Sequence, residues 1–532
     1  MHQALRIPEL IRSLFDQLSL ESSLAMALTS HTFLEPGLDR IWRKLCCFEQ
    51  LVASMPDDLF TKKSEEVLDG GFDIYVLFLR RALTAKDIER YKRFYAPRIR
   101  DLHFSFRAWD LDFTILSNEA FQALQVVTEW QPGALTPRLE IMHRWLPVEE
   151  EISTLKIDPF PNYGAPYLSL FLGEHVYSLD MPVYPRVPLW TTTVQCILGQ
   201  HPSLKELTLS SDTTSSLEGL LGASLWPNLE RLSIQGSYVT SFTMNQLSRL
   251  PRLSSLTIAL GGSPLSPMAD QPTRFQYLEK LQIRADTLTN VVTSLDGLPR
   301  LKTLKDLSLI IYTSAPRADI QTIIGSIQAQ NPSNLESLVW KDGIAYGDVS
   351  VAPMDVDLDG TIDISPFFQF KELRTLKIQI SETIQLTPLQ ATQIPMYWPH
   401  IQELILCGSQ LYYQPPLTDH SHILSIMASC RALTSVGLRF DSTRVTGNET
   451  SPTSLSRIRA FHVDCLSPIL SPSRVLKFMS ANFSKTMVFR VEGGYGYEEP
   501  GTTPQPIGPY QRWEAVAKGW ENIQETARLS QA

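Results

Sequence analysis

The stretch from residue 278 to residue 309 reads LEKLQIRADTLTNVVTSLDGLPRLKTLKDLSL, and it contains one short pattern twice. The pattern is apolar-x-x-apolar-x-apolar, formed by Leu278, Leu281 and Ile283 and then by Leu304, Leu307 and Leu309. Apolar residues two positions apart point to one face of a β-strand. The stretch therefore predicts two short strands, each with one buried face.

The same pattern recurs along most of the chain. Copies that begin at Leu204, Leu229, Leu253, Leu278 and Leu304 are about 25 residues apart, which is within the range of leucine-rich repeats. Later copies, at Leu335, Leu373, Ile401 and Leu433, are about 28 to 38 residues apart and must carry insertions. Because one unit cannot bury its apolar face alone, the units are expected to stack. The predicted fold is α/β, an irregular leucine-rich-repeat solenoid with parallel strands on its concave face.

Side chains that alternate with the buried ones point to the opposite face of each predicted strand. They are small, polar and of mixed charge, and solenoids commonly bind other proteins on such a face. The charged ones form the candidate substrate surface: Glu206, Arg231, Lys280, Asp306, Lys377 and Glu403. An ordinary solvated strand face is the alternative for each of them.

Residues 7–51 precede the repeats and carry apolar residues at helical spacing. One stripe consists of Leu10, Ile11, Leu14, Phe15 and Leu18, and shorter stripes follow around Leu28 and Trp42. Pro8 suits the first turn of the first helix. These apolar faces are wider than three short helices need among themselves, so a helical partner or the end of the solenoid is expected to cover the remainder. A bundle that only caps the solenoid is the alternative.

The N-terminal stretch IPELIRSLFDQL at 7–18, continued by RIWRKL at 40–45, resembles the F-box, whose pattern opens with Leu-Pro, has Ile-Phe one turn later and closes on Leu-Trp. Ile7 and Ile41 replace the first and the last of these leucines. A resemblance to fungal F-box proteins with degenerate leucine-rich repeats covers nearly the whole chain. It continues at DIERYKRFYAPRIRDL (87–102), ISPFF (364–368), YWP (397–399), LRFDST (438–443) and LSPI (466–469).

The resemblance implies the substrate-recognition subunit of a Skp-cullin-F-box ubiquitin ligase, in which partner subunits rather than this chain catalyse ubiquitin transfer. The F-box helices would dock on a Skp-type adaptor and its cullin complex, and the repeats would bind an unknown protein substrate. The adaptor-binding residues carried over are Pro8, Ile11, Leu14, Phe15, Leu28 and Trp42, some of which would contact the adaptor while others hold the helices together. A leucine-rich-repeat scaffold without a ubiquitin link is the alternative function.

The expected organisation is an F-box-like helical segment at 1–55, a helical connector and first repeat at 56–135, the solenoid at 136–490, and a flexible loop with a C-terminal helix at 491–532. The formal net charge of −9 gives no field that would attract nucleic acid or an anionic membrane. No secretory signal, no apolar run of the roughly 20 residues that cross a bilayer, and no C-x-x-C pair are visible. The sequence predicts an intracellular protein of the cytoplasm or nucleus.

Two stretches of the sequence resemble three chemical motifs, but their context argues against each motif. Asp357-Leu358-Asp359-Gly360-Thr361 matches the D-x-D-G-T of haloacid-dehalogenase-like phosphatases, yet the preceding stretch is short and broken by Pro353. Asp355, Asp357 and Asp359 also have the spacing of an EF-hand, but Pro366 stands where the closing glutamate belongs. Residues 493–496 are glycine-rich without the Lys-Ser/Thr of a phosphate loop. We therefore predict no catalytic residue, metal or cofactor.

Overall fold

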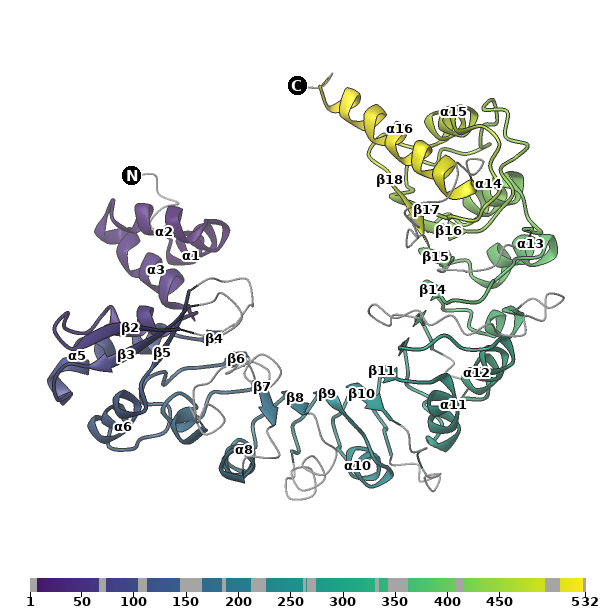
Figure 1. The fold of residues 1–532 in the computed structure, drawn as a ribbon. Coiled ribbons are helices and arrows are strands. Elements are labelled where there is room, and N and C mark those ends of the chain that lie inside the picture. The colour runs from purple at the N-terminus through teal and green to yellow at the C-terminus, as the bar shows by residue number, and fades with distance from the viewer. Residues whose placement is uncertain are drawn as a thin grey trace. The chain divides into compact units, whose positions relative to one another are not determined.

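The repeated pattern forms a ladder of parallel strands, visible in Figure 1. The computed structural model describes residues 7–66, 73–103, 112–143, 165–183, 188–211, 226–261, 265, 274–330, 334–342, 362–407, 415–492 and 508–529. The chain consists of two units, Met1–Leu253 and Ser254–Ala532, and each has its own stretch of the ladder.

In the first unit, the ladder contains six described strands in the order β1-β4-β6-β7-β8-β9, and a separate sheet has the order β2-β3-β5. The elements are α1 (Pro8–Gln17), α2 (Leu20–Ala27), α3 (His31–Trp42), β1 (Lys44–Leu45), α4 (Phe48–Val52), β2 (Phe60–Glu66), β3 (Asp73–Leu79), α5 (Ala85–Phe94), the 3₁₀ helix η2 (Ala96–Arg98), β4 (Asp101–His103), β5 (Asp112–Leu116), α6 (Asn118–Val127), β6 (Ile141–His143), η4 (Ala165–Leu170), β7 (Ser178–Val183), α8 (Pro188–Gln200), β8 (Glu206–Ser211), β9 (Arg231–Tyr238) and α10 (Ser241–Leu247).

In the second unit, nine described strands run in sequence order from β10 to β18, and every neighbouring pair is parallel. The elements are β10 (Ser255–Leu260), β11 (Lys280–Ala285), α11 (Leu288–Gly297), β12 (Asp306–Ile311), α12 (Arg317–Gln330), β13 (Ser337–Lys341), η5 (Ser365–Gln369), β14 (Thr375–Gln379), α13 (Pro388–Tyr397), β15 (Glu403–Leu406), α14 (His420–Ser429), β16 (Ser435–Leu438), β17 (Ala460–Asp464), α15 (Pro472–Asn482), β18 (Val488–Glu492) and α16 (Pro509–Leu529).

Each of the nine predicted copies of the apolar pattern coincides with one strand, from β8 to β16. The apolar residues are buried as the alternation requires; Leu281 and Ile283 of β11 are 1% and 0% exposed. Successive strands lie in register, and at the start of most described strands two consecutive N–H groups donate to one carbonyl of the preceding strand segment. The N–H groups of Lys305 and Asp306, for example, donate to the Glu279 carbonyl at 2.8 and 2.9 Å. The predicted leucine-rich-repeat fold is confirmed.

The ladder begins earlier than the sequence predicts. Leu45 in β1 pairs with Leu102 in β4, so the first strand follows directly on the third N-terminal helix. The segment 56–135, expected to be a helical connector with a first repeat, also contains the sheet β2-β3-β5, in which β2 and β3 are antiparallel and β3 and β5 parallel. The predicted segment boundaries themselves stay a prediction.

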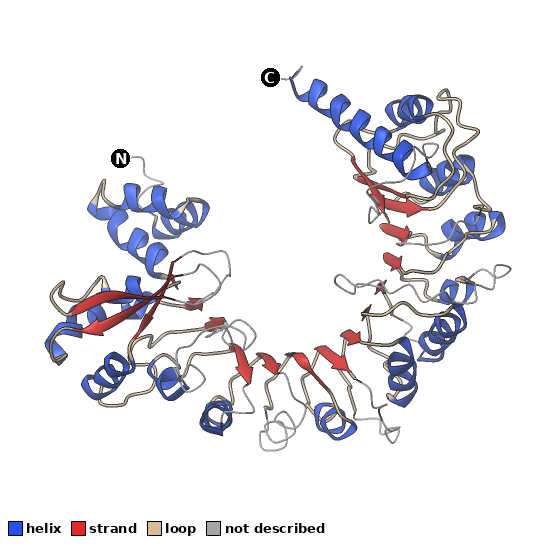
Figure 2. Cartoon of the chain, in the orientation of Figure 1, coloured by secondary structure: helices blue, strands red, loops and turns tan. Residues whose placement is uncertain are grey.

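Helices cover one face of the strands in the second unit, as Figure 2 shows in blue against red. The last helix, α16, packs over the final strands with Trp513 and Trp520 fully buried. Their indole N–H groups donate to the carbonyls of Ser467 and Met487 at 2.8 and 2.9 Å. The end of the ladder is thereby covered by a dedicated helix. Among the described helices, none combines the length and apolar character needed to cross a bilayer.

Candidate functional site

The three N-terminal helices form a small bundle in which α1 and α2 both pack on α3. Ile11 and Phe15 supply the buried side of α1. Gly37 of α3 lies so close to α2 that a Cβ atom placed there would come within 2.4 Å of the Ala27 Cβ. The absence of a side chain at Gly37 therefore permits the close approach of α2 and α3. Ser19 and Ser30 cap the second and third helices with their hydroxyl groups.

The outer side of this bundle is apolar and exposed. Three residues on α1 and its N-cap and three on α2 and its C-cap are each between 39% and 75% exposed: Ile7, Leu10, Leu14, Leu20, Leu24 and Leu28. On each helix they recur every three or four residues and so form one stripe. Within 22 residues, six large aliphatic side chains are in contact with water. An ordinary protein surface exposes such side chains singly and scattered rather than in a group. We call this set the leucine stripes.

The structure sorts the six residues predicted to bind an adaptor into two groups. Pro8, Leu14 and Leu28 are exposed, whereas Ile11 and Phe15 are 3% and 1% exposed and lie inside the bundle.

The sixth of these residues, Trp42, is half-buried, and its ring centroid lies 4.3 Å from that of Tyr95. Trp42 thus joins α3 to the residue that precedes η2. Sequence reasoning did not include Leu20 among the apolar stripes, although its spacing of four residues from Leu24 could have identified it.

Arg98 also fastens the helical bundle to the rest of the first unit. Its guanidinium donates to the Glu35 carboxylate at 2.5 Å and to the Asp39 carboxylate, both on α3. The Arg98 side chain is mostly buried, and these two carboxylates raise its pKa although burial opposes the charge. The bundle is therefore held to η2 by charge as well as by the Trp42 ring.

The six predicted substrate-surface residues form three ion pairs between neighbouring strands. Glu206 pairs with Arg231 in the first unit, and in the second unit Lys280 pairs with Asp306 and Lys377 pairs with Glu403. The Lys280–Asp306 distance is 3.0 Å, and these two residues are direct partners in the register of β11 and β12. The pairing follows from a parallel register that places equivalent positions side by side.

Further pairs flank these at the strand entrances. Lys305 Nζ lies 2.8 Å from Glu279, and Arg374 Nε lies 3.3 Å from Glu336. The Glu279 carboxylate bonded to it raises the pKa of Lys305. The strand face opposite the buried leucines is thus lined by charges of alternating sign that compensate each other locally.

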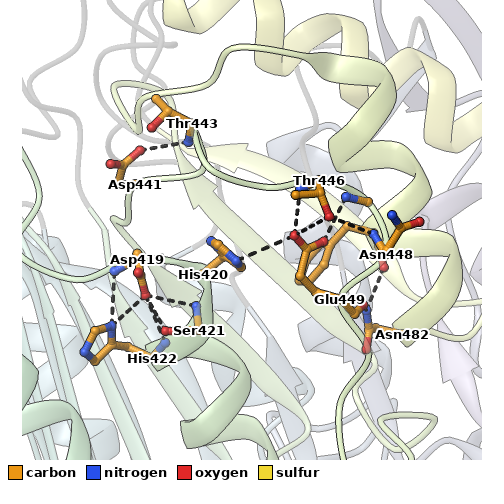
Figure 3. Close-up of polar contacts among 12 residues, drawn as sticks. Asp419, His420, Ser421, His422, Asp441, Thr443, Thr446, Asn448, Glu449 and Asn482 are labelled. Carbon is orange, nitrogen blue, oxygen red and sulfur yellow. Dashed lines mark hydrogen bonds and ion pairs between the residues drawn. The ribbon is translucent and has the colours of Figure 1, made fainter.

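A polar network fastens the loop after β16 to helices α14 and α15, as Figure 3 shows. Asp419 caps α14, and its Oδ1 accepts the Ser421 hydroxyl at 2.6 Å and lies 2.7 Å from His422 Nδ1. Glu449 accepts the backbone N–H groups of Thr446 and Gly447 at 2.7 and 2.8 Å. Burial opposes ionisation of both carboxyl groups, but these hydrogen bonds outweigh it and lower the pKa of Asp419 and of Glu449 to about 2.

Ser421, His422 and Asp419 form the N-terminal cap of α14, and Glu449 binds N–H groups of the loop. The Ser421 hydroxyl and the His422 ring both bond to the same Asp419 oxygen, so the aspartate does not orient the imidazole toward the serine as a nucleophile and base require. The network therefore explains the local fold of the loop.

The other sequence motifs lie mostly outside the described residues. Asp355, Asp357 and Asp359 fall in 343–361, and the glycine-rich stretch falls in 493–507. Within the described part of the chain, no three His, Cys, Asp or Glu side chains converge as metal ligands would. The thiols of Cys407, Cys430 and Cys465 are buried, and burial raises the pKa of each.

No family model matches the chain, and no curated protein is similar to it in sequence. Solved structures with a similar fold include a leucine-rich-repeat protein of Leptospira interrogans, which is 14% identical over 68% of this chain and 79% of that one with a TM-score of 0.33. An internalin from Listeria monocytogenes is 12% identical over 73% and 90%, also at 0.33. The Rad7 and Elc1 complex of yeast gives 15% over 64% and 77% at 0.32. The fold assignment rests on the strand ladder of the chain itself.

Proposed function

We propose that this chain is the substrate-recognition subunit of a Skp-cullin-F-box type ubiquitin ligase. In this proposal the N-terminal helices bind a Skp-type adaptor, the repeats bind a protein substrate, and ubiquitin transfer is catalysed by partner subunits. The observation that carries the proposal is the position of the leucine stripes, on a bundle directly followed by the first strand of a leucine-rich-repeat ladder. An intracellular location belongs to the same proposal.

The leucine stripes have the character of a surface that a partner covers. Full burial of a leucine or isoleucine side chain contributes about 1.5–3 kcal/mol, so covering the exposed half of each contributes about 1 kcal/mol. Six such side chains make the stripes a credible hot spot even after the cost of association is subtracted. In this proposal Pro8, Leu14 and Leu28 contact the adaptor, whereas Ile11, Phe15 and Trp42 hold the bundle in shape.

The charged strand face is the proposed substrate surface. Within the second unit, parallel strands in register present these side chains as a row without intervening described helices, which suits an extended protein segment. Each candidate residue already has a partner on the next strand, so a substrate would have to replace or extend these ion pairs.

A repeat scaffold without a ubiquitin link is the second candidate function. It is favoured by the direct passage from α3 into β1 and by the ion pairs of Arg98 with α3, because both features would be expected of a bundle that only caps the ladder. The two candidates differ in one property, the binding of an adaptor to the leucine stripes.

Co-purification of the full chain with a Skp-type adaptor from the same organism tests the proposal. The test variant is Leu10→Asp/Leu24→Asp, which places one charge on each stripe. The control is Leu389→Asp/Met396→Asp, which makes equivalent changes at side chains 66% and 77% exposed on α13 in the second unit. Circular dichroism spectra of both variants should match that of the wild type, because none of the four side chains is buried.

We expect the wild type and the α13 variant to retain the adaptor and the stripe variant to lose it, because an aspartate buried in an apolar interface costs several kcal/mol. Failure of the folded wild type to bind would favour the scaffold. Equal binding by the wild type and the stripe variant would show that the adaptor uses another surface.

A further inference from the structure

A groove of about 520 Å³ lies in the first unit, where the N-terminal bundle meets the start of the ladder. Its walls come from α1 and α3, from the end of α5 and η2, and from the residues just before β4 and β6. All the cationic side chains that line it are arginines: Arg12, Arg40, Arg43, Arg93, Arg98, Arg100 and Arg138. These arginines come from four separate stretches of the sequence, at residue 12, 40–43, 93–100 and 138, and converge only in the fold.

Three of the arginines are compensated by carboxylates of the groove. Arg98 pairs with Asp39, Arg43 Nη1 lies 3.7 Å from Asp16, and Arg100 Nε lies 3.6 Å from Glu140. These are the only acidic side chains among the lining residues. The described carboxylates of the groove are therefore all engaged.

The other four arginines, Arg12, Arg40, Arg93 and Arg138, have no carboxylate within ion-pair distance in the described part of the chain. Arg40 Nε donates instead to the Phe15 carbonyl at 3.3 Å, which holds its side chain at the groove. The seven guanidinium groups are opposed by the carboxylates of Asp16, Asp39 and Glu140 and by that of Glu35, which also pairs with Arg98, so an excess of three positive charges remains in one concave site. The chain as a whole has a formal net charge of −9, so this concentration is local.

Guanidinium groups gathered in this way repel one another unless an anion lies between them. The use of arginine throughout, with no lysine, also favours a particular chemistry, because the planar guanidinium donates two parallel hydrogen bonds to phosphate oxygens. The volume is that of a site for a small molecule.

We propose that this groove binds a small anion carrying two or more phosphate groups. The phosphates would take the place of the missing carboxylates opposite Arg12, Arg40, Arg93 and Arg138. Because the groove is lined by α1 and α3 on one side and by η2 and the entrances of β4 and β6 on the other, the bound anion would join the N-terminal bundle to the first rungs. The leucine stripes are not part of the groove, so this inference is independent of adaptor binding.

Isothermal titration of the full chain with inorganic tripolyphosphate, at constant ionic strength and with a chelator present, tests the proposal. The groove variant is Arg12→Gln/Arg93→Gln/Arg138→Gln, which leaves the three internal ion pairs and the Arg40 hydrogen bond in place. The control variant is Arg249→Gln/Arg431→Gln/Arg444→Gln, three exposed arginines elsewhere with the same total change in charge. Citrate serves as a carboxylate anion for comparison.

We expect saturable binding of tripolyphosphate by the wild type and the control variant, and a loss of affinity of at least about tenfold in the groove variant, which corresponds to one charge-assisted contact or more. A rise in melting temperature with tripolyphosphate should accompany binding in the wild type and be reduced in the groove variant.

Equal affinity in the groove and control variants would overturn the assignment, because attraction by net charge alone would then explain the binding. Citrate binding as tightly as tripolyphosphate would overturn the choice of phosphate. A doubly phosphorylated peptide that binds more tightly than tripolyphosphate through the same arginines would overturn the small molecule in favour of a phosphorylated protein segment.

Discussion

Replacement of Asp342 by asparagine should reduce the loss of folding stability that the second unit undergoes as the pH rises. Asp342 follows β13 and is 4% exposed. Its Oδ1 accepts the Ser381 N–H at 2.5 Å, whereas its Oδ2 has no hydrogen-bond partner among the described residues. Burial therefore outweighs the bond from Ser381 and raises the pKa of Asp342 from 3.8 to about 7.

The direction of this change in stability depends on whether the folded or the unfolded chain holds the proton. Between about pH 4 and pH 7 the folded chain keeps Asp342 protonated while the unfolded chain has released the proton, so the free energy of unfolding falls as the pH rises. The full loss, for a difference of about three pKa units, is at most about 4 kcal/mol and is complete above about pH 8. Between pH 5 and pH 9 the loss attributable to Asp342 is about 2–3 kcal/mol.

Urea denaturation of the wild type and of Asp342→Asn, followed by circular dichroism at pH 5 and pH 9, measures this loss. Asparagine has nearly the same shape, can accept the Ser381 N–H, and does not ionise. The two proteins should have similar stability at pH 5, and the variant should be more stable at pH 9. The same change in midpoint between the two pH values for both proteins would refute the assignment of a protonated carboxyl group to this position.

Three further predictions concern other parts of the chain. Asp464 is fully buried and burial raises its pKa to about 6, so Asp464→Asn should also reduce the loss of stability with rising pH, but with the loss complete near pH 7; an unchanged pH profile would contradict this. Gly37→Ala should destabilise the N-terminal bundle by about 1–3 kcal/mol because its Cβ would clash with Ala27, which faster hydrogen exchange in α1–α3 alone would reveal and unchanged exchange would disprove. A double-mutant cycle with Lys280→Ala and Asp306→Ala should give a coupling of about 0.2–1 kcal/mol that decreases in high salt; a salt-independent value would be evidence against a surface ion pair.

The sequence predicts the repeats well because their physics is local. An apolar residue every second position, repeated at a regular interval, is sufficient to place β8 to β16. The short strands β1, β4 and β6 contain two or three residues, too few to show any alternation, and they exist because the strand beside them completes their hydrogen bonds. They could only be found from the fold.

The candidate sites are harder to predict from the sequence, because they depend on contacts between segments that are distant in the chain. Apolar spacing identifies the stripe on α1, but only the packing against α3 separates buried Phe15 from exposed Leu14. The arginine groove gives no sequence signal at all, because Arg12 and Arg138 are more than one hundred residues apart in the chain.

The pairing of charges on the strand face changes how that surface should be interpreted. As a list of residues, Glu206, Arg231, Lys280 and Asp306 suggest a surface that selects a charged substrate. In register, each charge faces its opposite on the next strand, and exposed pairs of this kind are nearly neutral at a distance. A protein bound along this face would therefore be selected by shape and hydrogen bonding more than by net charge. Affinity for the proposed substrate should accordingly depend weakly on salt, whereas binding of the proposed anion in the arginine groove should weaken strongly with salt.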